Sequence, residues 1–264
     1  MKKTYLTIAL TLTCIVALNA LPEVTHATTK TTGDASFSKD DGMIINPIKP
    51  GTEDDITPEN PTTVENVDGV RLVYVPKFNF GVNKTALTTK NFPVKQMTYG
   101  KGGTNYEMPQ FVQVADLSGK EGTIWTVTAE QTAPLTSTDT AKHVLTNSRI
   151  KFKGATVTNN LNNAEVADMV TPVTASNLPV KDVDGGALTV FSSKGAAGKK
   201  STNGTISSMV FKNGYVESDY KTAAGATLND RGNNTDVELQ LEQNDKVQTK
   251  DYQAEIVWTL TVTP

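Results

Sequence analysis

The stretch Tyr252–Val262, with the sequence YQAEIVWTLTV, decides the fold class of this chain. Its apolar and aromatic side chains occupy every second position, and the positions between them are mostly polar. The alternating apolar set consists of Tyr252, Ala254, Ile256, Trp258, Leu260 and Val262. Because successive side chains of a β-strand point to opposite faces, this pattern predicts a long strand with one face turned toward a core.

A second segment repeats the same pattern in the middle of the chain. Ile124–Ala129 reads IWTVTA and Val257–Val262 reads VWTLTV, so Trp125 and Trp258, the only two tryptophans, lie in near-copies of one motif. If the two strands are neighbours, both tryptophans lie in one core layer. The alternation favours tryptophans that pack inside, and a direct contact between the rings and a ligand remains the alternative.

The other strand candidates are short and are separated by turn-forming pairs such as Asn203-Gly204 and Asn213-Gly214, which adopt positive φ angles without strain. They are Val70–Val75, Met108–Asp116, Thr123–Ala129, Arg149–Val157, Ala187–Ser192, Ile206–Phe211 and Val237–Leu241. One short helix fits within Asn160–Val170. The pattern predicts an all-β fold, a single elongated sandwich or barrel-like domain of antiparallel strands with long loops.

The first 27 residues have the features of a signal peptide. Lys2 and Lys3 precede the apolar stretch Leu6–Leu21, and small residues precede a cleavage point after Ala27. We therefore expect a secreted protein without membrane insertion, since no later apolar stretch reaches spanning length. Cys14, the only cysteine, leaves with the signal, which excludes disulfides and thiolate metal sites in the mature chain.

Charge divides the mature chain into two parts. Thr28–Asp68 holds three lysines, nine acidic residues and four prolines, for a net charge of −6, and we expect an extended, mostly disordered arm. Gly69–Pro264 holds 20 basic and 18 acidic residues, for a net charge of +2, and its length fits one β domain. A body so close to neutral does not fit nucleic-acid binding.

Reactive groups are few in the mature chain. His143 is its only histidine, and we interpret it as a surface residue rather than as part of a catalytic triad. Asp182–Gly186 resembles the start of a calcium loop but lacks the glycine at the sixth position, which favours a plain turn. Asp116, Glu121 and Glu130 flank the first tryptophan strand and leave a glycan hydrolase as the least favoured alternative. We expect no enzyme, no metal and no cofactor.

Several segments, in order along the chain, resemble the WxL-domain surface proteins of Gram-positive bacteria. They are Val75–Gly81, Val112–Gly119 followed by Trp125, Leu145–Ser148 and Tyr252–Leu260. The residues that carry the resemblance are the two motifs Trp125-Thr126-Val127 and Trp258-Thr259-Leu260, supported by Phe78, Phe80, Gly81, Asp116, Leu117, Gly119, Tyr252, Ala254 and Ile256. One position departs from the family pattern, because Val127 stands where leucine is usual.

The resemblance implies a function at the cell surface. It implies non-covalent attachment to the wall through peptidoglycan, and assembly with a membrane-anchored WxL-interacting protein and other surface proteins. A protein-interaction module or adhesin, whose main ligand is a partner surface protein or a host protein, is the alternative. If both tryptophans belong to the core, the ligand surface lies elsewhere, for example on the loop Lys194–Lys200.

Overall fold

The computed structural model describes residues 35–36, 45–59, 65–225 and 227–263, and the predicted signal peptide lies outside this range. The chain divides into two units, residues 1–37 and 38–264, and the fold described below is that of the second. Its named strands pair in antiparallel fashion and form five sheets, none of which closes into a barrel among the described residues. The predicted all-β, antiparallel class is confirmed.

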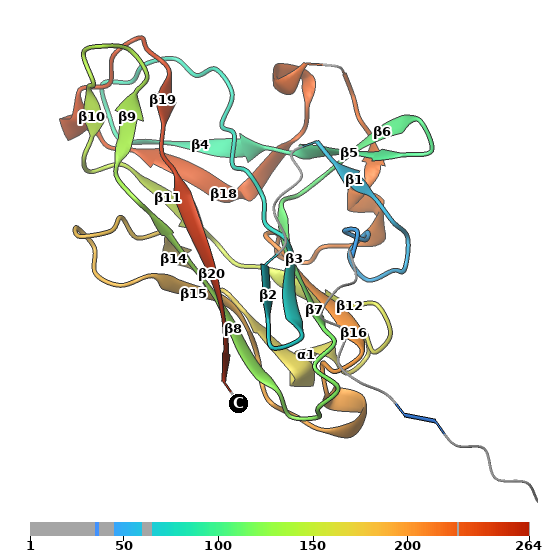
Figure 1. Ribbon diagram of the computed structural model, residues 1–264. Coiled ribbons are helices and arrows are strands. Elements are labelled where there is room, and N and C mark those ends of the chain that lie inside the picture. The colour runs from blue at the N-terminus through green and yellow to red at the C-terminus, as the bar shows by residue number, and fades with distance from the viewer. Residues whose placement is uncertain (1–34, 37–44, 60–64, 226, 264) are drawn as a thin grey trace, which may run out of the picture. The chain divides into compact units, whose positions relative to one another are not determined.

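The two tryptophan motifs lie side by side in a four-stranded sheet. Its order is β13 (Val170–Pro172), β15 (Leu188–Ser193), β8 (Ile124–Gln131) and β20 (Ile256–Thr263). β8 and β20 pair along their whole length, with Trp125 opposite Val262 and Trp258 opposite Ala129 (Figure 1). β20 is the outermost strand of this sheet. The two motif strands are therefore neighbours, which was the condition under which both tryptophans would lie in one layer.

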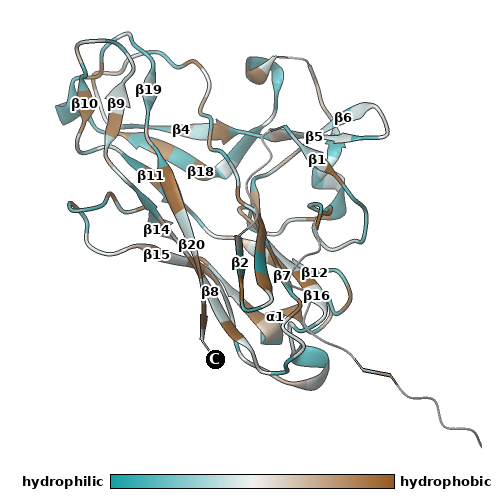
Figure 2. Ribbon diagram, viewed as in Figure 1, coloured by the Kyte–Doolittle hydropathy of each residue, from teal (hydrophilic) through white to brown (hydrophobic). Residues whose placement is uncertain are grey.

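A five-stranded sheet shares its core with the motif sheet. Its order is β12 (Thr156–Asn159), β16 (Thr205–Val210), β7 (Phe111–Asp116), β3 (Val70–Tyr74) and β2 (Glu65–Val67). Val70 and Val114 from this sheet and Val127 and Leu260 from the motif sheet belong to one hydrophobic cluster. The brown stretches of β3, β8 and β20 in Figure 2 show how the apolar residues of both sheets contribute to it.

A third sheet adds Val94, Ile150, Phe152 and Val237 to the same core. Its order is β14 (Ser176–Asn177), β11 (Arg149–Phe152), β18 (Asn233–Leu241) and β4 (Lys90–Lys95). The single strand expected over Arg149–Val157 is two strands, β11 and β12, which belong to different sheets. The chain changes direction at Gly154, whose φ is +150° and where any side chain would overlap that of Asn213.

Two smaller sheets complete the fold and have hydrophobic clusters of their own. The first has the order β1 (Thr57–Pro58), β5 (Met97–Lys101), β6 (Thr104–Met108) and β17 (Lys221–Thr222). The second has the order β10 (Val144–Leu145), β9 (Leu135–Ser137) and β19 (Tyr252–Gln253). In the described part of the chain, the helical elements are α1 (Val166–Met169) and four 3-10 turns, Gly198–Lys200, Glu217–Asp219, Leu228–Asp230 and Gln243–Asp245.

The strand expected over Tyr252–Val262 is interrupted. Tyr252 and Gln253 form β19 and pair with β9, whereas β20 begins at Ile256 and pairs with β8. Between the two, the backbone N–H of Thr132 donates a 3.0 Å hydrogen bond to the carbonyl of Glu255. The period of two is kept on both sides of the interruption, which is why the sequence pattern reads as continuous.

Residues 45–59, within the stretch expected to form a mostly disordered arm, are ordered and belong to the β unit. Ile48 and Ile56 are buried, and β1 pairs with β5. The side-chain amide of Gln113 satisfies both backbone groups of Ile48, accepting from its N–H at 2.9 Å and donating to its carbonyl at 3.0 Å. Local composition gives no sign of this contact, because the partner lies 65 positions away.

Candidate functional site

Trp125, the tryptophan of the first motif, is an interior residue. Its side chain is 1% exposed and meets the ring of Phe191 edge to face, with the ring centroids 5.0 Å apart. Its backbone N–H donates to the Ser193 hydroxyl at 2.8 Å, and its indole Nε1–H donates to the Thr202 hydroxyl at 3.2 Å. Both N–H groups of this buried tryptophan, on the backbone and on the indole, therefore donate to hydroxyl oxygens, as burial requires.

Asp116 holds the Thr202 hydroxyl in place. This hydroxyl donates to Asp116 Oδ2 at 2.6 Å, and Oδ1 accepts from the backbone N–H and the hydroxyl of Ser118 at 3.1 and 2.6 Å. Asp116 is itself only 1% exposed. The turn after β7 thus supports Trp125 through Thr202. The motif segment Val112–Gly119 is therefore explained by its role in packing. No spacing or motif in the sequence predicts this role of Thr202.

The neighbours of Asp116 fix the same turn to two other parts of the chain. The backbone N–H of Leu117 donates to the carbonyl of Gly69 at 2.9 Å. The N–H of Gly119 donates to Asn203 Oδ1 at 3.0 Å, and Gly119 has a φ of +72°, which favours glycine. Two further motif positions, Leu117 and Gly119, therefore shape the support under Trp125.

Trp258, the tryptophan of the second motif, is only half-buried. Its ring centroid lies 6.4 Å from that of Phe78 and 6.4 Å from that of Phe211. Phe78 also meets Phe152, at 5.6 Å, so this motif residue is brought from the N-terminal segment to the second tryptophan. Phe80 packs at the border of the same core. The two motif copies are therefore not equivalent, because one indole is enclosed and the other is partly in water.

The remaining motif residues divide between the two faces of the sheet. Val127 and Leu260 lie directly opposite each other, are 0% and 5% exposed, and face the core. Thr126 lies opposite Thr261 on the other face, and Thr259 is exposed there as well. Each motif therefore directs its Trp and its aliphatic residue inward and its Thr outward.

The supporting motif residues lie at the margins of this sheet. Ile256 borders the main core, whereas Tyr252 and Ala254 pack against the small leucine cluster of the β10-β9-β19 sheet. Gly81 has a φ of +70°, and its N–H donates to Asn79 Oδ1 at 2.9 Å. The structure therefore gathers most of the motif residues around one sheet and its core, and it leaves Tyr252, Ala254 and Gly81 outside that sheet.

A family model described as WxL domain surface cell wall-binding matches residues 24–264. The chain belongs to the WxL family. No curated protein and no solved structure matches it. The match makes this WxL domain a surface cell-wall-binding domain that acts in association with the wall, outside the cell. In the part of the chain that the structure describes, no helix has the length and apolar character needed to cross a membrane.

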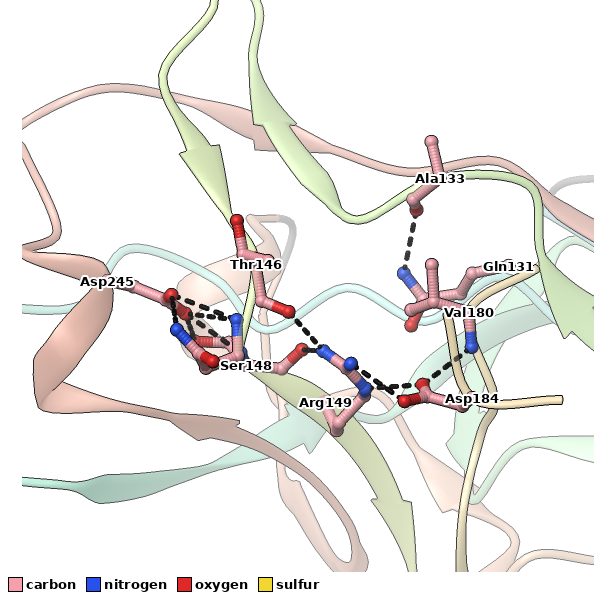
Figure 3. A network of polar contacts seen from close by, with 9 residues as sticks. Gln131, Ala133, Thr146, Ser148, Arg149, Val180, Asp184 and Asp245 are labelled. Atoms are coloured by element: carbon pink, nitrogen blue, oxygen red, sulfur yellow. Dashed lines mark hydrogen bonds and ion pairs between the residues drawn. The ribbon is translucent and has the colours of Figure 1, made fainter. Parts of the chain in front are cut away.

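The Leu145–Ser148 segment of the WxL domain serves as a clamp for Asp245 (Figure 3). The carboxylate of Asp245 accepts from the backbone N–H groups of Asn147 and Ser148, at 2.9 and 2.8 Å, and from both of their side chains. Burial raises the pKa of Asp245, but the hydrogen bonds from Ser148 and Asn147 outweigh that effect and hold the pKa below its ordinary value. This segment of the motif therefore stabilises the fold.

Arg149 extends the same network to the acidic turn that resembles a calcium loop. Its guanidinium binds both carboxylate oxygens of Asp184, at 2.6 and 2.9 Å, and donates to the carbonyls of Thr146 and Ser148 (Figure 3). The hydrogen bond from Arg149 lowers the pKa of Asp184. No group of three or more possible metal ligands occurs among the described residues. The Asp184 carboxylate is instead paired with the Arg149 guanidinium.

His143 lies in the β9–β10 connection of the WxL domain and is half-buried. Its ring nitrogen Nδ1 is 2.9 Å from the Tyr252 hydroxyl, and that hydroxyl also accepts from the backbone N–H of Gln248 at 3.1 Å. This contact ties β19 to the neighbouring hairpin. It gives His143 a structural contact in place of the plain surface position expected from the sequence.

Asp116 and Glu130, two of the three acidic residues near Trp125, do not form a pair suited to glycan hydrolysis. Asp116 is buried and bonded to Thr202, which places it level with Trp125 at one end of β8. Glu130 lies five residues further along that strand, about 17 Å away at strand spacing. Paired carboxylates in glycosidases lie about 5–9.5 Å apart. The geometry gives no support to the hydrolase alternative through these two residues.

The lysine-bearing loop 194–200 is engaged within the chain. Lys194 Nζ donates to the carbonyl of Ala167 at 2.5 Å. Lys200 forms a 2.8 Å ion pair with Asp168. Both contacts tie the loop to α1. Two of its lysines are therefore committed to structure, which weakens the interpretation of this loop as the ligand surface.

Proposed function

We propose that this WxL domain holds a secreted protein on the Gram-positive wall by binding peptidoglycan non-covalently and without catalysis. The observation that supports this proposal is the motif sheet. The two family motifs lie on neighbouring strands, β8 and β20, with apolar residues turned toward a common core and threonines turned outward. Such a sheet combines a rigid interior with an open outer face, which is the arrangement of a binding module rather than of a catalytic cleft.

Co-sedimentation tests wall attachment. We expect the mature chain, residues 28–264, to sediment with purified Gram-positive sacculi and to stay in solution without them. Retention on sacculi stripped of wall polymers by acid identifies peptidoglycan as the ligand. A chain that remains in the supernatant with both preparations, at low and at moderate salt, would refute wall binding. Loss of binding after acid treatment would refute the assignment to peptidoglycan.

Catalysis is tested on the same material. The turbidity of a sacculus suspension should stay constant over hours in the presence of the mature chain, with lysozyme as the positive control. A steady fall in turbidity would contradict a purely binding role.

Assembly with other surface proteins, including a membrane-anchored WxL-interacting protein, is the second function we propose, and β20 favours it. Within the described residues this outermost strand pairs only with β8, and Ile256–Thr263 contains no charge and no proline. Natural edge strands usually carry such blocking residues, and an edge without them suits strand addition by a partner. A pull-down from wall extracts after complete peptidoglycan digestion tests this. Recovery of a partner at full yield supports it, and loss of every partner on digestion contradicts it.

A further inference from the structure

The outward face of the motif sheet carries two rows of hydroxyl side chains, which we call the hydroxyl face. The first row runs across all four strands and consists of Thr171, Ser192, Thr126 and Thr261. The second crosses three strands and consists of Thr189, Thr128 and Thr259. Directly paired residues share a face of the sheet, so the pairing alone assembles the array. The hydroxyls recur about every 4.8 Å across the strands and about every 6.8 Å along them.

The hydroxyl groups of this face have no hydrogen-bonding partner among the residues that the structure describes. Four of the seven residues are exposed and three are partly buried, and none donates or accepts a side-chain hydrogen bond with another described residue. Buried hydroxyls elsewhere are occupied, as in the contacts of Thr202 with Asp116 and of Thr205 with the Thr202 carbonyl. The seven hydroxyls are therefore available to a ligand as both donors and acceptors.

Charge identifies the class of ligand. Neither row contains an acidic or a basic residue. The next outward residue of β8 is Glu130. The chain continues past the end of β15 with Lys194, whose ammonium is bonded to the carbonyl of Ala167. A polyanion would meet no free cation in the rows and one carboxylate at their border. A protein partner would find none of the aromatic residues or arginines that dominate protein interfaces within the rows. A neutral polymer rich in hydroxyl and amide groups matches the face best.

We propose that the hydroxyl face is the surface that binds the glycan strand of the wall, with the strand lying flat across the threonine and serine rows. This inference rests on the proposed wall-binding function and names its ligand, a neutral chain of N-acetylated sugars. In this proposal the two tryptophans do not contact the ligand. They pack on the core side of the motif sheet and support the hydroxyl face on its other side. Each hydroxyl contact is weak in competition with water, so strength comes from repetition of contacts along the polymer.

Threonine methyl NMR with a linear β-1,4-linked N-acetylglucosamine hexamer tests the site directly. The methyl signals of the hydroxyl-face threonines should shift on titration. Those of Thr104, Thr222 and Thr235, which are also exposed strand residues, should not. Shifts confined to other regions, or no shifts at all, would overturn the assignment. This measurement uses the wild-type chain and so does not depend on whether a variant folds.

A matched pair of triple variants tests the wall itself. Thr128→Val, Thr259→Val and Thr261→Val together should weaken binding to sacculi and to the hexamer at least tenfold while the melting temperature stays unchanged. The control Thr104→Val, Thr222→Val and Thr235→Val should bind like wild type. Wild-type binding by the first triple would overturn the inference but leave wall attachment intact, whereas a wild-type chain that ignores sacculi refutes the proposed function itself. A wild-type dimer that the first triple converts to monomer would show that a second copy covers this face, which also overturns the inference.

Discussion

Trp125 and Thr202, 77 positions apart, are joined by a hydrogen bond in the core of the domain. The indole N–H donates to a hydroxyl that in turn donates to the carboxylate of Asp116. An interior tryptophan, a hydroxyl and a buried carboxylate thus form one connected polar chain. This relationship gives a physical reason for the joint occurrence of Asp116 and Trp125 in the sequence motif.

Replacing Thr202 by valine tests this chain of bonds. The change leaves the indole N–H without an acceptor and Oδ2 of Asp116 without its donor, while Oδ1 keeps its bonds from Ser118, so we expect the free energy of unfolding to fall by about 2–4 kcal/mol. Urea denaturation measures the effect. The exposed Thr235→Val serves as the control and should change stability by less than about 0.5 kcal/mol. Equal stability of both variants would show that the bonds contribute nothing.

The two tryptophans should differ in their effect on stability. Trp125→Ala opens a cavity in a closed core and should cost about 3–5 kcal/mol. Trp258→Ala should cost less, because part of its ring is already in contact with water. Guanidinium denaturation of the two variants decides the order, and a larger loss for Trp258 would contradict the burial described above.

Val127, the position at which the first motif departs from the expected leucine, lies in the closed core. It is fully buried, opposite Leu260 and beside Phe191 on the paired strand. Val127→Leu adds a methylene to a filled core and should destabilise the domain by about 1–3 kcal/mol. Val257→Leu, on the exposed face of β20, is the matched control and should be neutral. Thermal unfolding measures both, and a gain in stability for Val127→Leu would reveal spare volume at this position.

Asp245 should confer a pH dependence on stability. The pKa of its carboxyl is lower in the folded state than the ordinary value of 3.8. A group with a depressed folded-state pKa contributes stability that is fully present above its unfolded pKa and is lost as the pH falls through the folded one. We therefore expect Asp245→Asn to be less stable than wild type at pH 7, with a difference that shrinks once the pH drops below 3.8. Denaturation midpoints at a series of pH values measure this, with the exposed Asp251→Asn as the control. A difference that stays constant down to low pH would contradict it.

Alternation and repetition predicted the central sheet from the sequence alone. The period of two in β20 placed Leu260 inside and Thr259 outside, as the structure shows. The likeness between the two motifs indicated that the fold uses one strand pattern twice, and the structure adds that the two strands are neighbours. These features are local, which is why the residue pattern contains them.

The features that escaped prediction depend on distant partners. The interruption before Ile256 marks a change of partner strand, from β9 to β8. The order of residues 45–59 depends on Gln113, and the role of Asp116 depends on Thr202. The sequence of a single strand predicts neither the partial exposure of Trp258 nor the rows of hydroxyl side chains. Both follow from which strands become neighbours, and one sequence read segment by segment does not give that pairing.

The pairing of β8 with β20 has a consequence for biogenesis. Residue 125 stays without its strand neighbour until residue 262 is available, so the sheet closes only after a long loop of chain has been brought together. If the predicted signal peptide directs export from the N-terminus, the distal segment emerges last, and the interior of the domain is sealed only when it arrives. Premature termination anywhere in between would expose the apolar edge of β8 to proteases and to aggregation. Complete translocation is therefore required before the motif sheet can close, and only intact chains can close it.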